Sequence, residues 1–262
     1  MKNHEKERLE VIAKTSLYAH EINGAMIQAC FRIFRRYLHD GPTLELGPAE
    51  GLMTDLLLDI CDDLTVVEGA KEFCDAIEAR HPGVRVINAL FEEFTPERKF
   101  SNIILGHVLE HVEDPVKVLK KAAKWLAPGG RILAAVPNSR SIHRQAAVIM
   151  GLLPYEEALN NADRHHGHRR VYNPETLRRD FHLAGLSIEV FGGYWLKPVS
   201  NSQIESNWTP EMLDAFMALG ERYPDIAAEI YVIAHSGPKK PCFSLHWKLG
   251  DKKWTPGCVR TS

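Results

Sequence analysis

Apolar and polar positions along the chain first predict a helical segment and then a series of short strands. Between residues 6 and 38, apolar side chains such as Ile22 and Met26 recur at helical spacing, which predicts a helical region. The pattern stops at Gly41-Pro42, and a glycine followed by a proline ends a helix. We therefore expect an N-terminal helical cap over residues 1–41.

Beyond this cap, short apolar runs alternate with helical stretches. The predicted strands are residues 43–46, 64–67, 84–87, 103–105, 131–136, 186–191 and 229–234. The predicted helices between them are residues 52–60, 70–80, 116–126 and 174–184, the last with Asn173 as its N-cap and Gly185 as its stop. Apolar strands that alternate with helices predict an α/β fold, in which helices cover both faces of a parallel sheet.

Two long stretches interrupt this alternation. Residues 138–172 include a run of histidines and arginines, and residues 192–228 contain tyrosine, tryptophan and lysine side chains. Loops of this length are usually functional or disordered. From residue 237 to residue 262, lysine and proline are frequent and no periodicity remains, so we expect a loosely held tail.

The first strand ends in a glycine-rich turn that runs directly into a helix. This turn, Glu45-Leu46-Gly47-Pro48-Ala49-Glu50-Gly51, places backbone N–H groups where they can bind a polar ligand. Glu68 ends the second strand, 21 positions after Gly47, where an acid can accept hydrogen bonds from a ribose diol. The two features together predict a nucleoside-containing cofactor.

The spacing of the glycines narrows the choice of cofactor. The dinucleotide pattern G-x-G-x-x-G is broken at Ala49 and Leu52. The turn instead resembles the acid-x-G-x-G-x-G motif of class I S-adenosylmethionine (SAM)-dependent methyltransferases, through Glu45, Gly47 and Gly51. Ala49 departs from the middle glycine, which is a small change if its φ is negative and a steric problem if φ is positive.

The resemblance continues along the chain in the order that the family shows. Segment 105–115 (LGHVLEHVEDP) is similar to the motif after strand four, and segment 126–131 (LAPGGR) to the turn before strand five. Residues 136–138 resemble the end of strand five, and residues 168–185 the segment before strand six. The resemblance implies a Rossmann-like, seven-stranded, mostly parallel sheet in a methyltransferase domain at 42–236. It also implies that 138–172 and 192–228 are acceptor-site insertions.

The same resemblance implies a set of cofactor-binding residues. They are Glu45, Gly47, Pro48, Gly51, Glu68, Gly69, Leu90, Phe91, His107 and Val108. Many relatives have an aspartate where Leu90 stands, so we expect stacking against Phe91 and backbone groups to recognise the adenine. Glu45 is expected to accept N–H groups of the cofactor loop, because an acid in a buried strand needs a partner. The N-terminal region could pack on the sheet edge or close over the cofactor through Tyr18.

His107, Glu110 and His111 share one helical face if this segment begins a helix, and could then hold a metal. H-x-x-E-H is also the signature of inverted zinc peptidases, although the nucleoside-cofactor context disfavours that reading. Some methyltransferases of ubiquinone synthesis and small-RNA methylation carry Glu-x-x-Glu-His here and bind a divalent ion. A metal through Glu110 and His111, with a further histidine from the long loop, is therefore one hypothesis. The alternative is that these side chains cap and orient neighbouring segments.

The resemblance implies direct methyl transfer from SAM to an oxygen or nitrogen of a small-molecule acceptor, with a sugar among the candidates. A hydroxyl acceptor must lose a proton, and imidazole suits that task at neutral pH. The candidate catalytic residues are His107, His111 and His166, and the candidate substrate-binding residues are His165, His168, Arg169, Tyr194, Trp195 and Lys197. The alternatives are a solvated histidine-rich loop and aromatic side chains that belong to the core.

Composition limits the remaining choices. With 32 Lys+Arg against 34 Asp+Glu and a formal net charge of −2, a nucleic-acid partner is not expected. The five cysteines form no C-x-x-C pair, and no apolar run is long enough to cross a membrane, so we expect reduced thiols and a cytoplasmic protein. An NAD-dependent oxidoreductase and a non-catalytic SAM-binding protein stay open as alternatives, and the sequence does not predict an oligomeric state.

Overall fold

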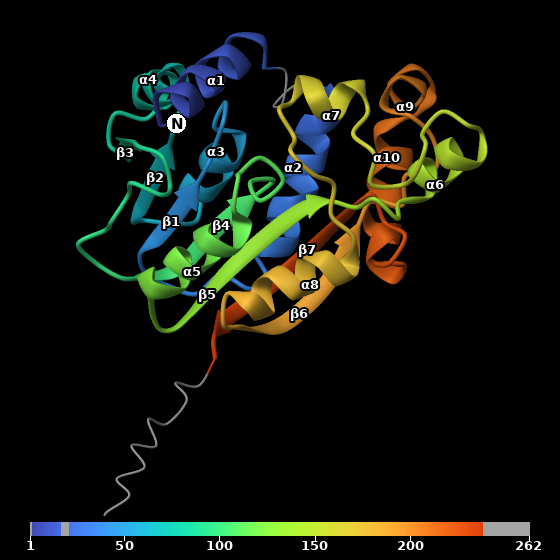
Figure 1. Cartoon of the computed structure of the whole chain (residues 1–262). Coiled ribbons are helices and arrows are strands. Elements are labelled where there is room, and N and C mark those ends of the chain that lie inside the picture. The colour runs from blue at the N-terminus through green and yellow to red at the C-terminus, as the bar shows by residue number, and fades with distance from the viewer. Residues whose placement is uncertain (1, 17–20, 238–262) are drawn as a thin grey trace, which may run out of the picture.

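A seven-stranded sheet runs through the middle of the molecule, with helices on both of its faces (Figure 1). The structure is a computed structural model, and it describes residues 2–16 and 21–237. The strands are β1 (Thr43–Leu46), β2 (Leu64–Glu68), β3 (Arg85–Asn88), β4 (Phe100–Gly106), β5 (Leu126–Pro137), β6 (Leu186–Tyr194) and β7 (Glu229–Ser236). The helices are α1 (Lys2–Thr15), α2 (Glu21–Phe34), α3 (Leu52–Leu58), α4 (Lys71–Arg80), α5 (Pro115–Trp125), α6 (Ile142–Ile149), α7 (Asn161–His165), α8 (Pro174–Leu183), α9 (Asn201–Asn207) and α10 (Pro210–Leu219), followed by a 3₁₀ turn at Gly220–Arg222.

The strand order is β3-β2-β1-β4-β5-β7-β6. Strands β1 to β5 pair in parallel, whereas β7 lies antiparallel between β5 and β6. The predicted Rossmann-like, mostly parallel fold is therefore confirmed. The carboxyl ends of β1, β2 and β4 meet at one edge, and because β7 is reversed, its first residue lies at that same edge.

The central strands β1, β2, β4 and β7 are buried along most of their length, which explains why they are continuous apolar runs rather than alternating ones, whereas the edge strands β3 and β6 are only partly buried. In β4, Ile103 and Leu105 pack into one core with α5 and α8, and Ile104 packs into the other with α2, α3 and α4. Neighbouring residues of each strand thus hold helices on opposite sides of the sheet.

Local signals set the ends of several elements as expected. The side chain of Asn173 accepts a hydrogen bond from the backbone N–H of Thr176 at the start of α8, and Gly185 has a φ of 79° just after this helix. The Pro-Gly-Gly turn before strand five is an irregular stretch of β5, because Leu126 pairs with Phe100 and the regular ladder resumes only at Arg131.

Three expectations about local structure were incomplete. The N-terminal region forms two helices, α1 and α2, and the expected role of Tyr18 lies outside the described residues. The stretch 138–172 contains α6 and α7, and the stretch 192–228 contains α9 and α10. Helices α7 and α9 are fixed by capping boxes rather than by apolar periodicity, and segments of five and seven residues are too short to show a period. The domain boundaries at residues 41 and 236 stay a prediction.

Helix α1 lies across the carboxyl edge of the sheet, close to α4 and α7 (Figure 1). Cys30, Cys61 and Cys74 are free, as expected, whereas Cys242 and Cys258 lie outside the described residues. In the parts of the chain that the structure describes, no helix combines the length and the apolar character that crossing a membrane requires.

Candidate functional site

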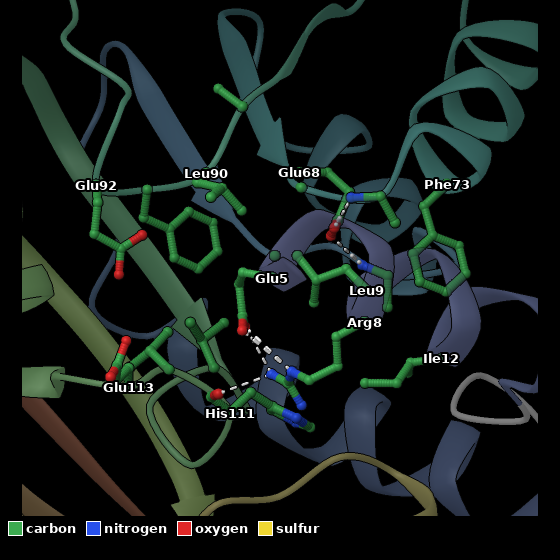
Figure 2. A pocket seen from close by; sticks show the side chains of 18 of the residues that line it. Glu5, Arg8, Leu9, Ile12, Glu68, Phe73, Leu90, Glu92, His111 and Glu113 are labelled. Atoms are coloured by element: carbon green, nitrogen blue, oxygen red, sulfur yellow. Dashed lines mark hydrogen bonds and ion pairs between the residues drawn. The ribbon is translucent and has the colours of Figure 1, made fainter. Parts of the chain in front are cut away.

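A cavity of about 550 Å³ opens at the carboxyl ends of β1, β2 and β4, beneath α1. Figure 2 shows Glu68 and Phe73 on one side of it and Leu90 and Glu92 on another, with side chains of α1 between them. Its volume is within the range of small-molecule and cofactor sites. The cavity is thus at the place where open α/β sheets bind their ligands.

The turn after β1 forms the floor of this cavity through Gly47 and Ala49. Gly47 has a φ of 68°, and a Cβ atom there would lie 3.0 Å from Val108 and 3.3 Å from Phe91. Ala49 has a φ of 50°, in the left-handed region. The alanine therefore stands at the kind of position that favours glycine, and its departure from the motif has a steric cost.

Glu68 joins this turn to the end of β2. Its Oε1 accepts the backbone N–H of Ala70 at 2.8 Å, and its Oε2 accepts that of Ala49 at 3.4 Å. Burial raises the pKa of Glu68 to about 7, although these backbone hydrogen bonds act in the opposite direction. The carboxylate is thus held at the cavity wall with lone pairs that can still accept a ligand's hydroxyl groups.

Glu45 has a different role from the one expected. Its Oε2 accepts a hydrogen bond from the hydroxyl of Thr54 on α3 at 2.7 Å, and it does not line the cavity. Burial raises the pKa of Glu45 to about 8. Glu45 therefore fixes α3 against β1 instead of binding the N–H groups of the loop. Pro48 and Gly51 also do not line the cavity, whereas the other seven expected cofactor residues do so: Gly47, Glu68, Gly69, Leu90, Phe91, His107 and Val108.

His107 follows β4 with a φ of 58° and forms part of the cavity wall. Its Nε2 lies 2.9 Å from the hydroxyl of Tyr194, and its Nδ1 lies 3.5 Å from Glu110 and 3.6 Å from Glu229. Burial alone would lower the pKa of His107, but these two carboxylates raise it overall. Both ring nitrogens therefore face protein groups.

His111 lines the cavity next to His107, and its ring meets that of His168 edge to face, with the centroids 4.7 Å apart. Burial lowers the pKa of His111 to about 4, so its imidazole is neutral at pH 7. One possible ligand atom from each of Glu110, His111 and His168 lies within 4.8 Å of the others. Nitrogen and carboxylate ligands at such a spacing suit a divalent transition metal.

The histidine-rich loop divides between the cavity and its support. His165 and His166 line the cavity, whereas His168 lies behind it, 3.4 Å from Asp163. Arg169 is engaged by protein groups, because it donates to the carbonyl of His111 at 2.9 Å and to Glu5 at 2.7 Å.

Tyr194, Trp195 and Lys197 do not line the cavity and lie deeper in the molecule. Tyr194 and Trp195 pack into the core on one face of the sheet, which was the alternative to substrate binding. Tyr194 still reaches the wall of the cavity through its contact with His107.

The N-terminal region was expected either to pack on the sheet edge or to close over the cofactor, and α1 covers the cavity with residues that the sequence analysis did not single out. Glu5, Arg8, Leu9 and Ile12 line the cavity from this helix. Arg8 donates to Glu5 at 2.9 Å and to the carbonyl of His111 at 3.2 Å, as Figure 2 shows. The only signal in the sequence was a weakly amphipathic, highly charged helix, which does not indicate what it covers.

The fold and the cavity define a nucleoside-cofactor enzyme of the α/β class, and comparison with known proteins names the class. The model of the methyltransferase domain family matches residues 18–189, more than half of the chain. The chain belongs to this family and is a SAM-dependent methyltransferase with the class I fold. The family does not support the oxidoreductase and zinc-peptidase alternatives.

Individual relatives are distant. A ubiquinone biosynthesis O-methyltransferase of Aeromonas salmonicida is 24% identical over 166 residues, which cover 60% of this chain and 68% of the relative. A ubiquinone biosynthesis O-methyltransferase of Xanthomonas euvesicatoria is 25% identical over 164 residues, which cover 60% of this chain and 67% of the relative. Among solved structures, the N-methyltransferase NodS of Bradyrhizobium japonicum, in complex with S-adenosylhomocysteine (SAH), has a TM-score of 0.59 at 14% identity and covers 90% of this chain and 99% of its own. A possible histamine N-methyltransferase of Thermotoga maritima has a TM-score of 0.57 at 16% identity, and the match covers 90% of this chain and 96% of the other. At these identities the structural likeness supports the fold alone.

Proposed function

We propose that this protein transfers the methyl group of SAM to a hydroxyl oxygen of a small-molecule acceptor, with a nitrogen acceptor as the variant. The observation that carries the proposal is the cavity itself, which places the carboxylate of Glu68 and the imidazoles of His111 and His166 around one space. The O-methyltransferase names of the distant relatives favour oxygen. A sugar acceptor stays a prediction, because no feature of the site favours it.

The residues at the cavity fit SAM. Glu68 would accept the ribose hydroxyls, and the turn at Gly47 and Ala49 would lie beneath the amino-acid part. Leu90 and Phe91 would pack against the adenine. A Cβ atom at Gly47 would lie 3.0 Å from Val108 and 3.3 Å from Phe91, so the glycine lets these two cavity-lining side chains pack closely against the turn.

When bound, SAM supplies a methyl group already activated by a positively charged sulfur. The protein then has to orient the acceptor, exclude water and take up a proton. Leu9 and Ile12 of α1 cover the cavity and would exclude water. His111 and His166 line the cavity, and burial lowers the pKa of both, so each would present a neutral imidazole to the acceptor hydroxyl. His107 would instead hold the cavity wall in place, because its two ring nitrogens face Tyr194 and the buried carboxylates and not the acceptor.

The experiment is an acceptor screen followed by SAH release, with phenols, sugars and amines as separate panels. We expect turnover with hydroxyl compounds, and a loss of about 10²- to 10⁴-fold in kcat for His111→Ala or His166→Ala, the usual contribution of a general base. Arg36→Ala, in the exposed pair with Glu221, is a control that should keep full activity. Turnover of amines alone, with both histidine variants fully active, would favour N-methylation, because an amine can lose its proton to solvent.

A second candidate is metal-assisted O-methylation through Glu110, His111 and His168. It is favoured by the ligand geometry and by the complete burial of Glu110, whose Oε1 has Nδ1 of His107 at the long distance of 3.5 Å. A divalent ion there would offset the cost of burying this carboxylate. Metal analysis of the purified protein and an EDTA titration test this idea. We expect bound metal to disappear in Glu110→Gln and His168→Ala, and full activity of metal-free enzyme would exclude it.

A further inference from the structure

A buried ion pair joins α6 to α7, the helix that precedes the histidines of the cavity wall. Arg144 of α6 donates from Nη1 to Oδ2 of Asp163 at 3.0 Å, and the two side chains are only 5% and 10% exposed. The same guanidinium donates from Nε to the carbonyl of Glu156 at 2.9 Å and also donates to the carbonyl of Ala158. Burying charges is costly unless they are paired and hydrogen-bonded. The pair therefore holds α7, and the chain that leads into it, against α6.

Asp163 makes contacts at both ends of the short segment that carries these histidines. At its start, Oδ2 of Asp163 accepts the backbone N–H of Asn160 at 2.9 Å, which completes the capping box of α7. At its end, the backbone carbonyl of Asp163 accepts the N–H of His168 at 2.8 Å. His165 and His166 lie between these two points and line the cavity. The position of Asp163 thus sets where the segment meets the cavity.

The other carboxylate oxygen of Asp163 faces the imidazole of His168. This Oδ1 lies 3.4 Å from Nδ1, a nitrogen that is buried and makes no shorter hydrogen bond within the described residues. Burial alone would raise the pKa of Asp163, but His168 and Arg144 lower it to about 2, so the carboxylate is ionised at pH 7. An ionised carboxylate can only accept hydrogen bonds. It therefore favours the tautomer of His168 that carries its proton on Nδ1.

The ring of His168 packs against His111 in the cavity wall. The two ring planes are nearly perpendicular, at 89°, with the centroids 4.7 Å apart. One nitrogen of each ring lies within 4.8 Å of the other. A rotation or a change of tautomer in His168 therefore changes the surface against which the His111 ring rests. Through this contact, Asp163 acts on a group that lines the cavity although it does not line the cavity itself.

We propose that Asp163 is a positioning residue of the methyltransferase site. It holds the proton of His168 on Nδ1 and so fixes the orientation of the His111 imidazole, while Arg144 holds the carboxylate in place. The inference rests on the proposed function, because it explains how the chain orients one of the two imidazoles that would take up the acceptor's proton. It adds to that function a residue outside the cavity.

The variant Asp163→Asn removes the charge with little change in shape. Oδ2 accepts from both Arg144 and Asn160, so the amide oxygen of the asparagine must take this place. The amide NH₂ group then takes the place of Oδ1 and faces Nδ1 of His168, to which it donates instead of accepting. We therefore expect the proton of His168 to move to Nε2 in this variant, with the cap of α7 still in place.

Nitrogen-15 NMR of histidine-labelled protein reports the tautomer directly. The spectra are recorded at about pH 8.5, above the usual range of imidazole pKa values. We expect the signals of His168 to show the Nδ1–H form in the unchanged protein and the Nε2–H form in Asp163→Asn. These signals are assigned by their loss in His168→Gln.

Kinetics separate a positioning role from a structural one. For the acceptor with the highest turnover in the screen, Asp163→Asn should lower kcat by about 10- to 100-fold and leave KM unchanged, the range found when an outer partner of a functional imidazole is removed. Asn160→Ala is the matched control, because it removes the other half of the capping box and keeps the carboxylate. This control should lower the temperature of thermal unfolding but keep both the Nδ1–H form and kcat.

The inference is contradicted by the Nε2–H form in the unchanged protein, by the same tautomer in both proteins, or by an unchanged kcat in Asp163→Asn. If Asp163→Asn does not fold, the tautomer of His168 in the unchanged protein decides. Failure of the unchanged protein to turn over any compound of the screen contradicts the proposed function instead, and the NMR measurement still shows whether Asp163 controls His168.

Discussion

The backbone N–H of Ala49 donates to Oε2 of Glu68 at 3.4 Å, and this contact joins the turn after β1 to the end of β2. Ala49 makes the contact with a φ of 50°, so the turn keeps the left-handed shape that the missing glycine would give. The two halves of the cofactor site are thus held together before any ligand binds, which reduces the ordering cost of binding.

The first prediction concerns the contact between Glu68 and the ribose. Glu68→Ala removes a buried acceptor and should weaken SAM binding by about 10- to 100-fold, because hydrogen bonds to a charged group contribute about 1.5–3 kcal/mol. Isothermal titration with SAM gives the affinity. Glu72→Gln, an exposed change at the start of α4, is the control and should bind as the unchanged protein does. An unchanged affinity in Glu68→Ala would remove the ribose contact from the proposal.

The second prediction uses the pKa of Glu68, which burial raises to about 7. The ionised carboxylate accepts ribose hydroxyls better than the protonated form does. Affinity should therefore be constant above about pH 7 and should fall as the pH decreases below it, by up to about 10-fold per unit. The ligand for this measurement is 5′-methylthioadenosine, which has the adenosyl group without the titrating amino acid. Glu68→Gln should remove this pH dependence, and a profile that is flat in the unchanged protein would contradict the assignment.

The third prediction tests the close approach at Gly47. Gly47→Ala places a methyl group 3.0 Å from Val108 in a residue with a φ of 68°, so SAM affinity should fall by about 10-fold, within the usual cost of overpacking. Gly129→Ala is a matched control, because Gly129 has a φ of 77° and nothing lies within 4 Å of the added methyl group. Both variants should lose about 1–2 kcal/mol of unfolding free energy, but only the first should lose affinity. Equal SAM affinities of the two variants would show that Gly47 is needed for the conformation of the turn and not for ligand binding.

The fourth prediction concerns the attachment of α1 over the cavity. Glu5 accepts hydrogen bonds from Arg8 at 2.9 Å and from Arg169 at 2.7 Å, which ties α1 to the histidine-rich loop. Glu5→Ala should speed SAH dissociation several-fold without unfolding the protein, because each partly exposed pair contributes about 0.2–1 kcal/mol. Stopped-flow displacement measures this rate. Asp214→Ala, which removes the exposed pair with Arg32, should leave it unchanged. An equal rate in Glu5→Ala would show that α1 does not limit ligand release.

The parts of the fold that depend on local pattern could be predicted from the sequence. The central strands are buried on both faces and so appear as apolar runs, and Asn173 and Gly185 mark the ends of α8 through capping chemistry. Helices α7 and α9 could not be recognised in the same way, since their capping boxes act over less than two turns. The position of Glu68 at the cavity could be expected from the sequence, because its spacing from the turn is fixed by the fold. The partner of Glu45 depends on how α3 packs, and spacing does not encode that.

Contacts between distant segments explain the rest of what the sequence did not reveal. Glu229 is an ordinary strand-starting residue in the sequence and becomes a neighbour of His107 only because β7 runs antiparallel beside β5. Arg169 carries a guanidinium group of the kind that binds anions, but it donates its hydrogen bonds to Glu5 of α1 and to the carbonyl of His111. Both outcomes depend on tertiary packing, which a single sequence does not display.

A crystal structure of the protein with SAH tests the central claim most directly. The account predicts the adenosyl group in the cavity beneath α1, with the ribose hydroxyls on the carboxylate of Glu68 and the adenine against Leu90 and Phe91. The account is contradicted if SAH binds at another place on the protein, or if the ribose lies in this cavity without contacting Glu68.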